Sequence, residues 1–195
     1  MSAVIVEQSV SLDGFSAGAN DSPGNGLGDN GERLHDWIFA NAAPESSGIM
    51  EAFWPRAGAV ILGRRMFDNG FEPWDRKNPW GRPAFVLTHD AREPLAEDDD
   101  PGFTFVTDGI ERALDFARAA AGDKVVAIAG GANTTQQYLR AGLVDGLNLH
   151  VVPVLLGDGV RFIEQMGDAQ VRFEAAGAPE TPGVAHLRYR VTAGQ

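Results

Sequence analysis

The stretch that decides the fold runs Val125-Val126-Ala127-Ile128-Ala129-Gly130-Gly131-Ala132-Asn133-Thr134-Thr135. Its apolar first half is typical of a buried strand, and the residues after the glycine pair, as far as Arg140, have the pattern of a helix. A strand that turns through Gly-Gly into a helix leaves backbone N–H groups free at the helix start, where the helix dipole adds partial positive charge. This turn therefore predicts a binding site for a phosphate or a pyrophosphate.

A second turn of this kind ends the apolar stretch 59–62, where Gly63 is followed by Arg64 and Arg65. The two guanidinium groups offer planar forks that suit phosphate oxygens. Neither motif suffices alone, because Gly-Gly also eases tight turns without a ligand and an arginine pair at a helix start is commonly solvated. Together they favour a nucleotide cofactor.

The composition excludes several classes of protein. The 195 residues suffice for a single domain, which we place at 1–195. The chain contains no cysteine, which excludes disulfides, thiolate metal sites and a cysteine nucleophile. A net charge of −11 argues against nucleic acid as a partner. Neither a signal-peptide pattern nor an apolar run of membrane-spanning length is present, so we expect a cytoplasmic protein without a membrane partner. We also expect no metal, because His35 and His150 lack partners at metal-ligand spacing.

The order of patterns predicts an α/β fold. Strands are expected over 3–12, 57–62, 83–88, 103–106, 124–129 and 147–156, and helices over 32–41, 49–54, 64–69, 110–121 and from the glycine pair to Arg140. The segments 170–176 and 185–191 alternate like an antiparallel pair. We therefore predict a three-layer αβα sandwich, mostly parallel with an antiparallel C-terminal edge. Residues 16–31, rich in Gly, Asn, Asp and Ser, predict a long mobile loop of the kind that covers active sites.

The ordered motifs resemble those of the dihydrofolate reductase-like superfamily and, within it, the reductase domain of riboflavin-biosynthesis deaminase-reductases. The matching motifs are Ser11-Leu12-Asp13-Gly14-Phe15, Leu62-Gly63-Arg64-Arg65-Met66-Phe67, Val86-Leu87-Thr88-His89, Ala129-Gly130-Gly131-Ala132 and Pro153-Val154-Leu155-Leu156-Gly157-Asp158-Gly159. They extend from near the start of the chain to about residue 160. The resemblance implies a dihydrofolate reductase-like fold and hydride transfer from NADPH to a pterin or to a pyrimidine intermediate, as in 5-amino-6-(5-phosphoribosylamino)uracil reductase.

The resemblance also implies roles for residues at matching positions. Gly63, Arg64 and Arg65 would meet the phosphates of NADPH, and Thr88 and His89 would lie near its adenosine and 2′-phosphate. Gly130, Gly131, Ala132, Asn133 and Thr134 would hold the pyrophosphate and the adjoining ribose. Asp13 and Gly14 would border the nicotinamide, with the 16–31 loop closing over it.

Reduction of a C=N bond also needs a proton, for which a buried carboxylate with a raised pKa is the usual device. Folate reductases carry this acid on their first helix, where Glu32 and Asp36 are the candidates here. We favour Asp36 because it adjoins Trp37, although a solvated helix carboxylate explains it equally well. Asp13 is the other candidate acid, with a plain turn role as its alternative.

Other features leave the substrate open. The segment 34–39 does not align cleanly with the folate-site helix, and only Arg33 or Lys77 offers itself for a substrate phosphate. No zinc deaminase half is present, which predicts a stand-alone reductase acting on a small heterocycle. The alternatives are dihydrofolate reductase proper, a flavin-binding reductase, or a non-catalytic dimeric nucleotide-binding protein. Because the apolar run 147–156 is long for a lone edge strand, we also predict a homodimer.

Overall fold

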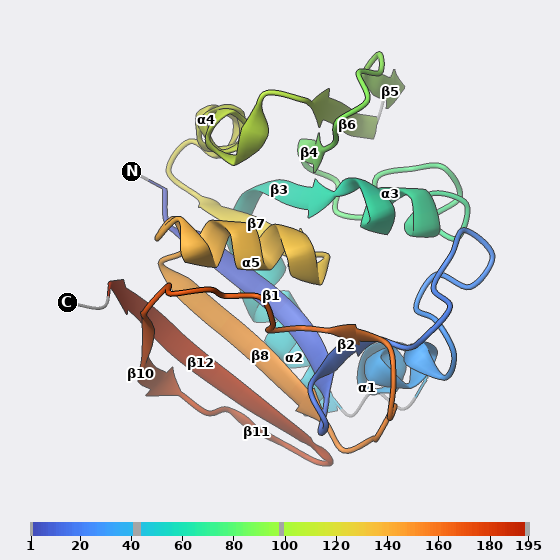
Figure 1. Cartoon of the computed structure of the whole chain (residues 1–195), viewed down its shortest axis with the longest axis vertical. Helices are drawn as coiled ribbons and strands as arrows, with labels where there is room; N and C mark the ends of the chain where they lie inside the picture. Colours follow the sequence, from blue (N-terminus) through green and yellow to red (C-terminus); the bar gives the residue numbers. More distant parts are fainter. Residues whose placement is uncertain (1, 41–43, 98–99, 194–195) are drawn as a thin grey trace.

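The computed structural model describes residues 2–40, 44–97 and 100–193, and it is built around one large mixed sheet (Figure 1). The strand order is β10-β12-β8-β1-β7-β3-β4-β6-β5, with β11 attached to β12. Its parallel part consists of β8 (Gly146–Val152), β1 (Val4–Ser11), β7 (Val125–Gly130), β3 (Ala57–Gly63), β4 (Ala84–Leu87) and β6 (Asp100–Val106). The antiparallel strands are β10 (Val171–Gly177), β11 (Glu180–Thr181), β12 (Val184–Ala193) and β5 (Leu95–Glu97). The predicted parallel sheet with an antiparallel C-terminal edge is confirmed.

Helices cover both faces of the sheet, as expected for three layers. They are α1 (Asp36–Phe39), α2 (Pro44–Phe53), α3 (Arg64–Gly70), α4 (Gly109–Ala121) and α5 (Ala132–Arg140), with short 3₁₀ turns at Gly31–His35 and Trp54–Arg56. Strand β3 shows how alternation divides the layers: Ala59 and Ile61 pack in the cluster that includes α4 and α5, whereas Val60 and Leu62 pack with Phe67 of α3. Within the described part of the chain, none of the helices has the length and apolarity needed to cross a membrane.

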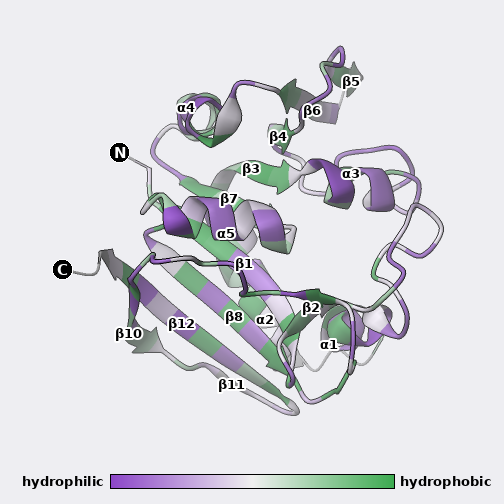
Figure 2. Cartoon of the chain, viewed as in Figure 1, coloured by the Kyte–Doolittle hydropathy of each residue, from purple (hydrophilic) through white to green (hydrophobic). Residues whose placement is uncertain are grey.

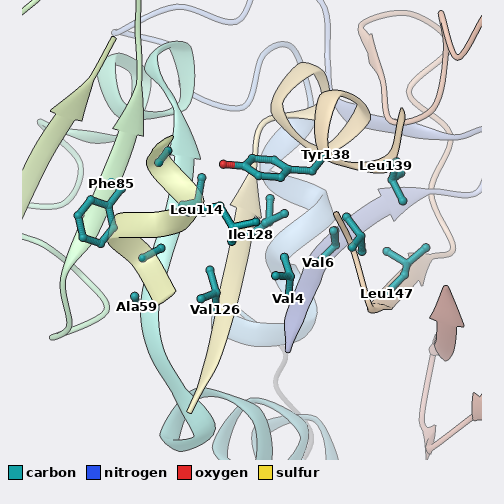
Figure 3. Packing of buried hydrophobic residues seen from close by; sticks show 14 of the residues in the cluster. Val4, Val6, Ala59, Phe85, Leu114, Val126, Ile128, Tyr138, Leu139 and Leu147 are labelled. Atoms are coloured by element: carbon teal, nitrogen blue, oxygen red, sulfur yellow. The ribbon is translucent and has the colours of Figure 1, made fainter. Parts of the chain in front are cut away.

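The central strands are apolar because both of their faces are covered. Val126, Ala127 and Ile128 of β7 are fully buried, and Figure 3 shows Val126 and Ile128 packed among side chains of β1, α4 and α5. Strands β8 and β12 instead alternate between hydrophobic and hydrophilic residues (Figure 2). Their polar residues therefore share one face of the sheet, the face on which α1 lies.

Several predicted elements differ in the structure. The 147–156 run forms β8, which ends at Val152 and pairs with β1 and β12 on its two sides, so the assignment of a lone edge strand was wrong. The predicted helix 32–41 is a 3₁₀ turn followed by α1, and its predicted end at Asn41 lies outside the described residues. Helix α2 begins at Pro44, earlier than predicted.

The 16–31 segment contains short paired stretches. It begins within β2 (Phe15–Ala17), which pairs with β9 (Val160–Arg161), and it contains a bridge between Ser22 and Asn25. It then runs alongside α3 (Figure 1).

Candidate active site

A cleft of about 1320 Å³ opens where β3, β4 and β7 end and the following turns begin. Strands β3 and β7 are neighbours in the sheet, with Leu62 opposite Gly130, so the two predicted phosphate turns lie side by side. They are in close contact: a Cβ atom added to Gly63 would lie 2.5 Å from Thr134 Oγ1 and 3.7 Å from Gly131 N. Residues far apart in the sequence thus form one wall of the cleft.

Most of the predicted cofactor residues line this cleft. They are Gly63, Arg64, Arg65, Thr88, His89, Gly131, Ala132, Asn133 and Thr134. Gly14 and Gly130 do not belong to the lining, but a Cβ on Gly130 would lie 3.2 Å from Oε1 of Gln8, which does. The structure therefore brings these residues together at one cleft.

The start of α5 leaves backbone donors available to a ligand. Its first residue follows Gly131, and no side chain caps this end of the helix. A Cβ on Gly131 would meet no atom within 4 Å, so the turn faces open space. Free N–H groups at the start of a helix favour an anion.

Acidic neighbours form ion pairs with both arginines. Arg64 Nε donates to Asp68 at 2.8 Å, and its Nη1 lies 3.6 Å from Asp90 and donates to Thr88 Oγ1 at 3.4 Å. Arg65 pairs with Asp21 of the 16–31 segment. The arginines are therefore held at the cleft by carboxylates that an anionic ligand would have to displace or share.

The 16–31 segment is anchored to α3 and forms another wall of the cleft. Asn69 Nδ2 donates to Asp21 Oδ2 at 3.0 Å and to the carbonyl of Gly26 at 3.3 Å. Ser16, Asp21, Asn25 and Leu27 are among the residues that line the cleft. The segment thus lies where the sequence predicted a covering loop.

The two acids predicted from the sequence, Asp13 and Asp36, lie outside the lining of the cleft. The Ser11 hydroxyl, helped by the backbone N–H groups of Gly157 and Leu156, lowers the pKa of Asp13 to about 2. The Asp13 carboxylate thus ties the end of β1 to the Leu156–Gly157 turn, and a raised pKa is wrong for it. Asp36 is partly buried, but neither Asp13 nor Asp36 belongs to the cleft lining, whereas the exposed Glu32 does.

A buried carboxylate does line the cleft, at a position that sequence reasoning missed. Glu7 of β1 is 7% exposed, and its Oε1 lies 2.7 Å from His150 Nε2 of β8. His150 Nδ1 lies 2.7 Å from His186 Nδ1 of β12, whose Nε2 lies 2.6 Å from Thr181 Oγ1. We call Thr181, His186, His150 and Glu7 the histidine chain. Its signal in the sequence was a glutamate inside an apolar strand, together with polar residues at alternate positions of β8.

The rest of the cleft is aromatic. Trp54, Trp74 and Trp80 line it, with ring centroids 6.3 Å apart for Trp54–Trp80 and 5.2 Å apart for Trp74–Trp80. The Arg82 guanidinium lies 6.0 Å from the centroid of the Trp54 ring, and partial burial lowers its pKa. Arg82 is thus the cation on this side of the cleft, whereas the predicted Arg33 and Lys77 are not in the lining.

Solved structures share this fold. A provisionally named riboflavin biosynthesis protein from Shewanella sp. PV-4 superposes with a TM-score of 0.75 at 22% identity, covering 97% of this chain and 99% of that chain. Dihydrofolate reductase from Enterococcus faecalis, complexed with NADP(H), gives a TM-score of 0.60 at 16% identity, with coverages of 99% and 97%. RibD from Acinetobacter baumannii gives 0.63 at 17% identity, and the match covers 98% of this chain but 58% of that chain. The fold is therefore dihydrofolate reductase-like.

The chain belongs to the family of the RibD C-terminal domain, whose model matches residues 2–186. The domains of this family are reductases. Membership therefore supports an oxidoreductase that is similar to the pyrimidine reductases of the riboflavin pathway. No curated protein matches the chain significantly in sequence. The resemblance found in the sequence motifs is thus confirmed at the level of family and fold.

Proposed function

We propose that this chain is an NADPH-dependent reductase that transfers a hydride to a pyrimidine- or pterin-like small molecule, similar to 5-amino-6-(5-phosphoribosylamino)uracil reductase. The observation that carries the proposal is the meeting of the two glycine turns at one cleft, with Gly63 packed against Thr134. The sequence predicts a phosphate site at each turn, and NADPH carries a pyrophosphate and a separate 2′-phosphate to fill them. Family membership supports the reductase class.

The residues present fit this cofactor. The uncapped start of α5 and the open space at Gly131 suit a pyrophosphate, while Arg64, Arg65 and His89 offer donors for the 2′-phosphate. Gln8 Oε1 is buried without a hydrogen-bond partner in the described structure, and Gln8 lines the cleft. This oxygen is an acceptor suited to a carboxamide N–H group such as that of nicotinamide.

NADPH supplies the hydride when bound, and the chain supplies position and a dry surrounding. Arg64 and Arg65 would anchor the phosphate end through charge-assisted hydrogen bonds. Trp54, Trp74 and Trp80 offer ring faces to a planar heterocycle, and Arg82 offers a donor to an anionic substituent. The 16–31 segment would exclude water from the space between these two ends.

Titration of NADPH and NADH into the wild type and an Arg65→Ala variant, followed by nicotinamide fluorescence, tests the cofactor assignment. We expect selective binding of NADPH, weakened roughly 10- to 100-fold in the variant, because a hydrogen bond to a charged group contributes about 1.5–3 kcal/mol. Arg190→Ala is the matched control, since Arg190 forms an exposed ion pair with Glu174 on the β10–β12 edge. Absence of binding of both nucleotides to the wild type would refute the proposal.

The substrate class is tested by adding 5-amino-6-(5-phosphoribosylamino)uracil or 7,8-dihydrofolate to the NADPH complex. Oxidation of NADPH with the pyrimidine supports the riboflavin-type assignment, whereas oxidation with dihydrofolate alone would identify a folate reductase. Binding of NADPH without oxidation by these or by related pyrimidines and pterins would favour the non-catalytic alternative.

A further inference from the structure

The two histidines of the histidine chain lie in one row across the sheet. Ser9 of β1, His150 of β8 and His186 of β12 are direct partners in register, and Glu7 lies opposite Asn148 in the next row. His150 and His186 are 3% and 2% exposed. Trp37 of α1 covers them, with ring centroids 4.8 Å and 4.9 Å from the two imidazoles. A buried line of polar groups this long is costly unless each member has a partner, and here each has one.

One end of the chain reaches the cleft and the other does not. Glu7 and His150 line the cleft, whereas Thr181 is partly exposed beyond β12 and outside the lining. Asn148 Nδ2 donates to the second carboxylate oxygen of Glu7 at 2.7 Å. Glu7 is therefore held through both of its oxygens while it faces the space where a substrate would bind.

The hydrogen bonds of the chain can be assigned a direction. Thr181 Oγ1 donates to the carbonyl of Val184 at 3.4 Å and lies 2.6 Å from His186 Nε2, so its oxygen accepts from His186. His186 then carries its proton on Nε2 and accepts on Nδ1 from His150 Nδ1, because only one proton fits between two nitrogens at 2.7 Å. His150 consequently has a free lone pair on Nε2, which accepts from the carboxyl O–H of Glu7. Each bond thus points away from Glu7, which carries the proton.

We propose that Glu7 is the general acid of this cleft and that His150, His186 and Thr181 are positioning residues that hold it; this role rests on the proposed reductase function. As the hydride adds to the electrophilic carbon of a C=N or C=O bond, the O–H bond of the Glu7 carboxyl breaks and its proton joins the adjacent nitrogen or oxygen. The electron pair of that O–H bond stays on Glu7, whose carboxylate still accepts from Asn148 Nδ2. Water entering the cleft after product release returns the proton.

Other charged groups face this system from every neighbouring element. His35, in the 3₁₀ turn before α1, couples electrostatically to His150 and is itself influenced by Asp36. Arg188 of β12 acts on His186, and burial, together with His150 and Arg188, lowers the pKa of His186 to about 4. His186 is therefore neutral near pH 7, as the directed chain requires.

The test combines two variants with measurements that a merely structural role would not change. Glu7→Gln removes the acid, and Thr181→Val removes the outermost acceptor of the histidine chain without altering the cleft. In single-turnover NADPH oxidation, with whichever of the two probe substrates the wild type reduces, we expect Glu7→Gln to lose roughly 10²- to 10⁴-fold in rate. Its NADPH affinity should stay within about twofold of the wild type, and its rate should lose the pH dependence and solvent isotope effect of proton transfer.

Thr181→Val should lose up to about tenfold in rate, corresponding to one hydrogen bond. Thr192→Val of β12 and Glu174→Gln of β10 are matched controls outside the histidine chain, and both should behave as the wild type. Nitrogen NMR of the histidines provides a readout that needs no substrate. In the wild type it should place the single proton of His186 on Nε2 and a proton of His150 on Nδ1, and Thr181→Val should weaken the preference at His186.

The outcomes separate this inference from the function on which it rests. A Glu7→Gln enzyme with wild-type rate, pH profile and isotope effect would overturn the role of Glu7 while the reductase function stands. A proton on Nδ1 of His186 would overturn the directed chain. A wild type that neither binds NADPH nor reduces either probe would refute the reductase proposal, and the role of Glu7 with it.

Discussion

Single carboxylates in this chain take opposite roles because of their surroundings. Asp13 accepts hydrogen bonds from Ser11 and two backbone N–H groups, which stabilise its charged form. Glu7 is buried at the cleft between a histidine and an asparagine. Residue type and local sequence alone cannot separate these two cases, because the neighbours of Glu7 come from β8 and those of Asp13 include the turn at Leu156.

Two histidines, the partly buried His35 and the buried His186, make stability depend on pH. Burial, with a smaller effect of His150, lowers the pKa of His35 to about 4, and burial chiefly lowers that of His186 to about 4. Between the ordinary value of 6.5 and about 4, the unfolded chain binds protons that the folded chain does not. The free energy of unfolding should therefore fall as pH decreases through this window, by up to about 1.4 kcal/mol per pH unit for each histidine. Urea unfolding at a series of pH values measures it.

His35→Phe isolates one of these contributions. The substitution keeps an aromatic ring beside Phe39, whose ring centroid lies 6.1 Å from that of His35, and removes the titrating group. We expect the variant to lose less stability than the wild type on acidification over the same window. If His35→Phe left the pH dependence of the unfolding free energy unchanged, burial of His35 would not be one of the causes of that dependence.

At the scale of elements, the contact between β3 and α5 sets the shape of the phosphate wall. Gly63 has an ordinary extended backbone, so only its close approach to Thr134 requires a glycine. Gly63→Ala should destabilise the protein by roughly 1–3 kcal/mol, the usual range for overpacking. In a Thr134→Ala background the added methyl has room, and the cost should fall below about 1 kcal/mol. Denaturant unfolding of the four proteins gives this double-mutant cycle, and equal costs in both backgrounds would contradict the argument.

The 16–31 segment depends on its anchor to α3. Asn69 is 6% exposed and bonds both Asp21 and Gly26 through its amide nitrogen. Asn69→Ala should speed amide hydrogen exchange in residues 18–28 and leave β7 unchanged, because few other contacts hold this segment. Glu72→Ala, which removes an exposed ion pair with Arg76, is the control and should leave exchange in the segment as it is. If residues 18–28 of the Asn69→Ala variant exchanged their amide hydrogens at the wild-type rate, contacts other than those of Asn69 would hold the segment in place.

Features formed by residues that adjoin one another in the chain could be predicted from the sequence. Features that depend on which strands pair in the sheet could not. The turns at Gly63 and Gly131 were recognisable because glycine, arginine and helix-start residues adjoin one another in the chain. The histidine chain was not, because it forms only when β8 lies between β1 and β12. An apolar run such as 147–156 has the same composition at an edge as inside a sheet, so its position could not be read from the pattern.

At the scale of the whole molecule, the sheet ends in two different edges. One edge is β5, and short edge strands of this kind are themselves protected from pairing. The other is β10, which pairs only with β12 in the described sheet and carries Phe173, 42% exposed. The argument for a homodimer therefore moves from β8 to β10, because an open edge with an exposed aromatic residue is normally covered.

A second copy of the chain covering β10 would give a particle of about twice 20.8 kDa by light scattering. Phe173→Glu should convert it to the monomer, since a charge at this edge opposes pairing with another strand. Leu155→Glu is the control: Leu155 is 65% exposed but precedes β9 and lies outside β10. A monomeric wild type would show the homodimer prediction to be wrong. Dissociation by Leu155→Glu and not by Phe173→Glu would instead place the interface near the end of β8, on the side of the sheet where the 153–159 turn begins.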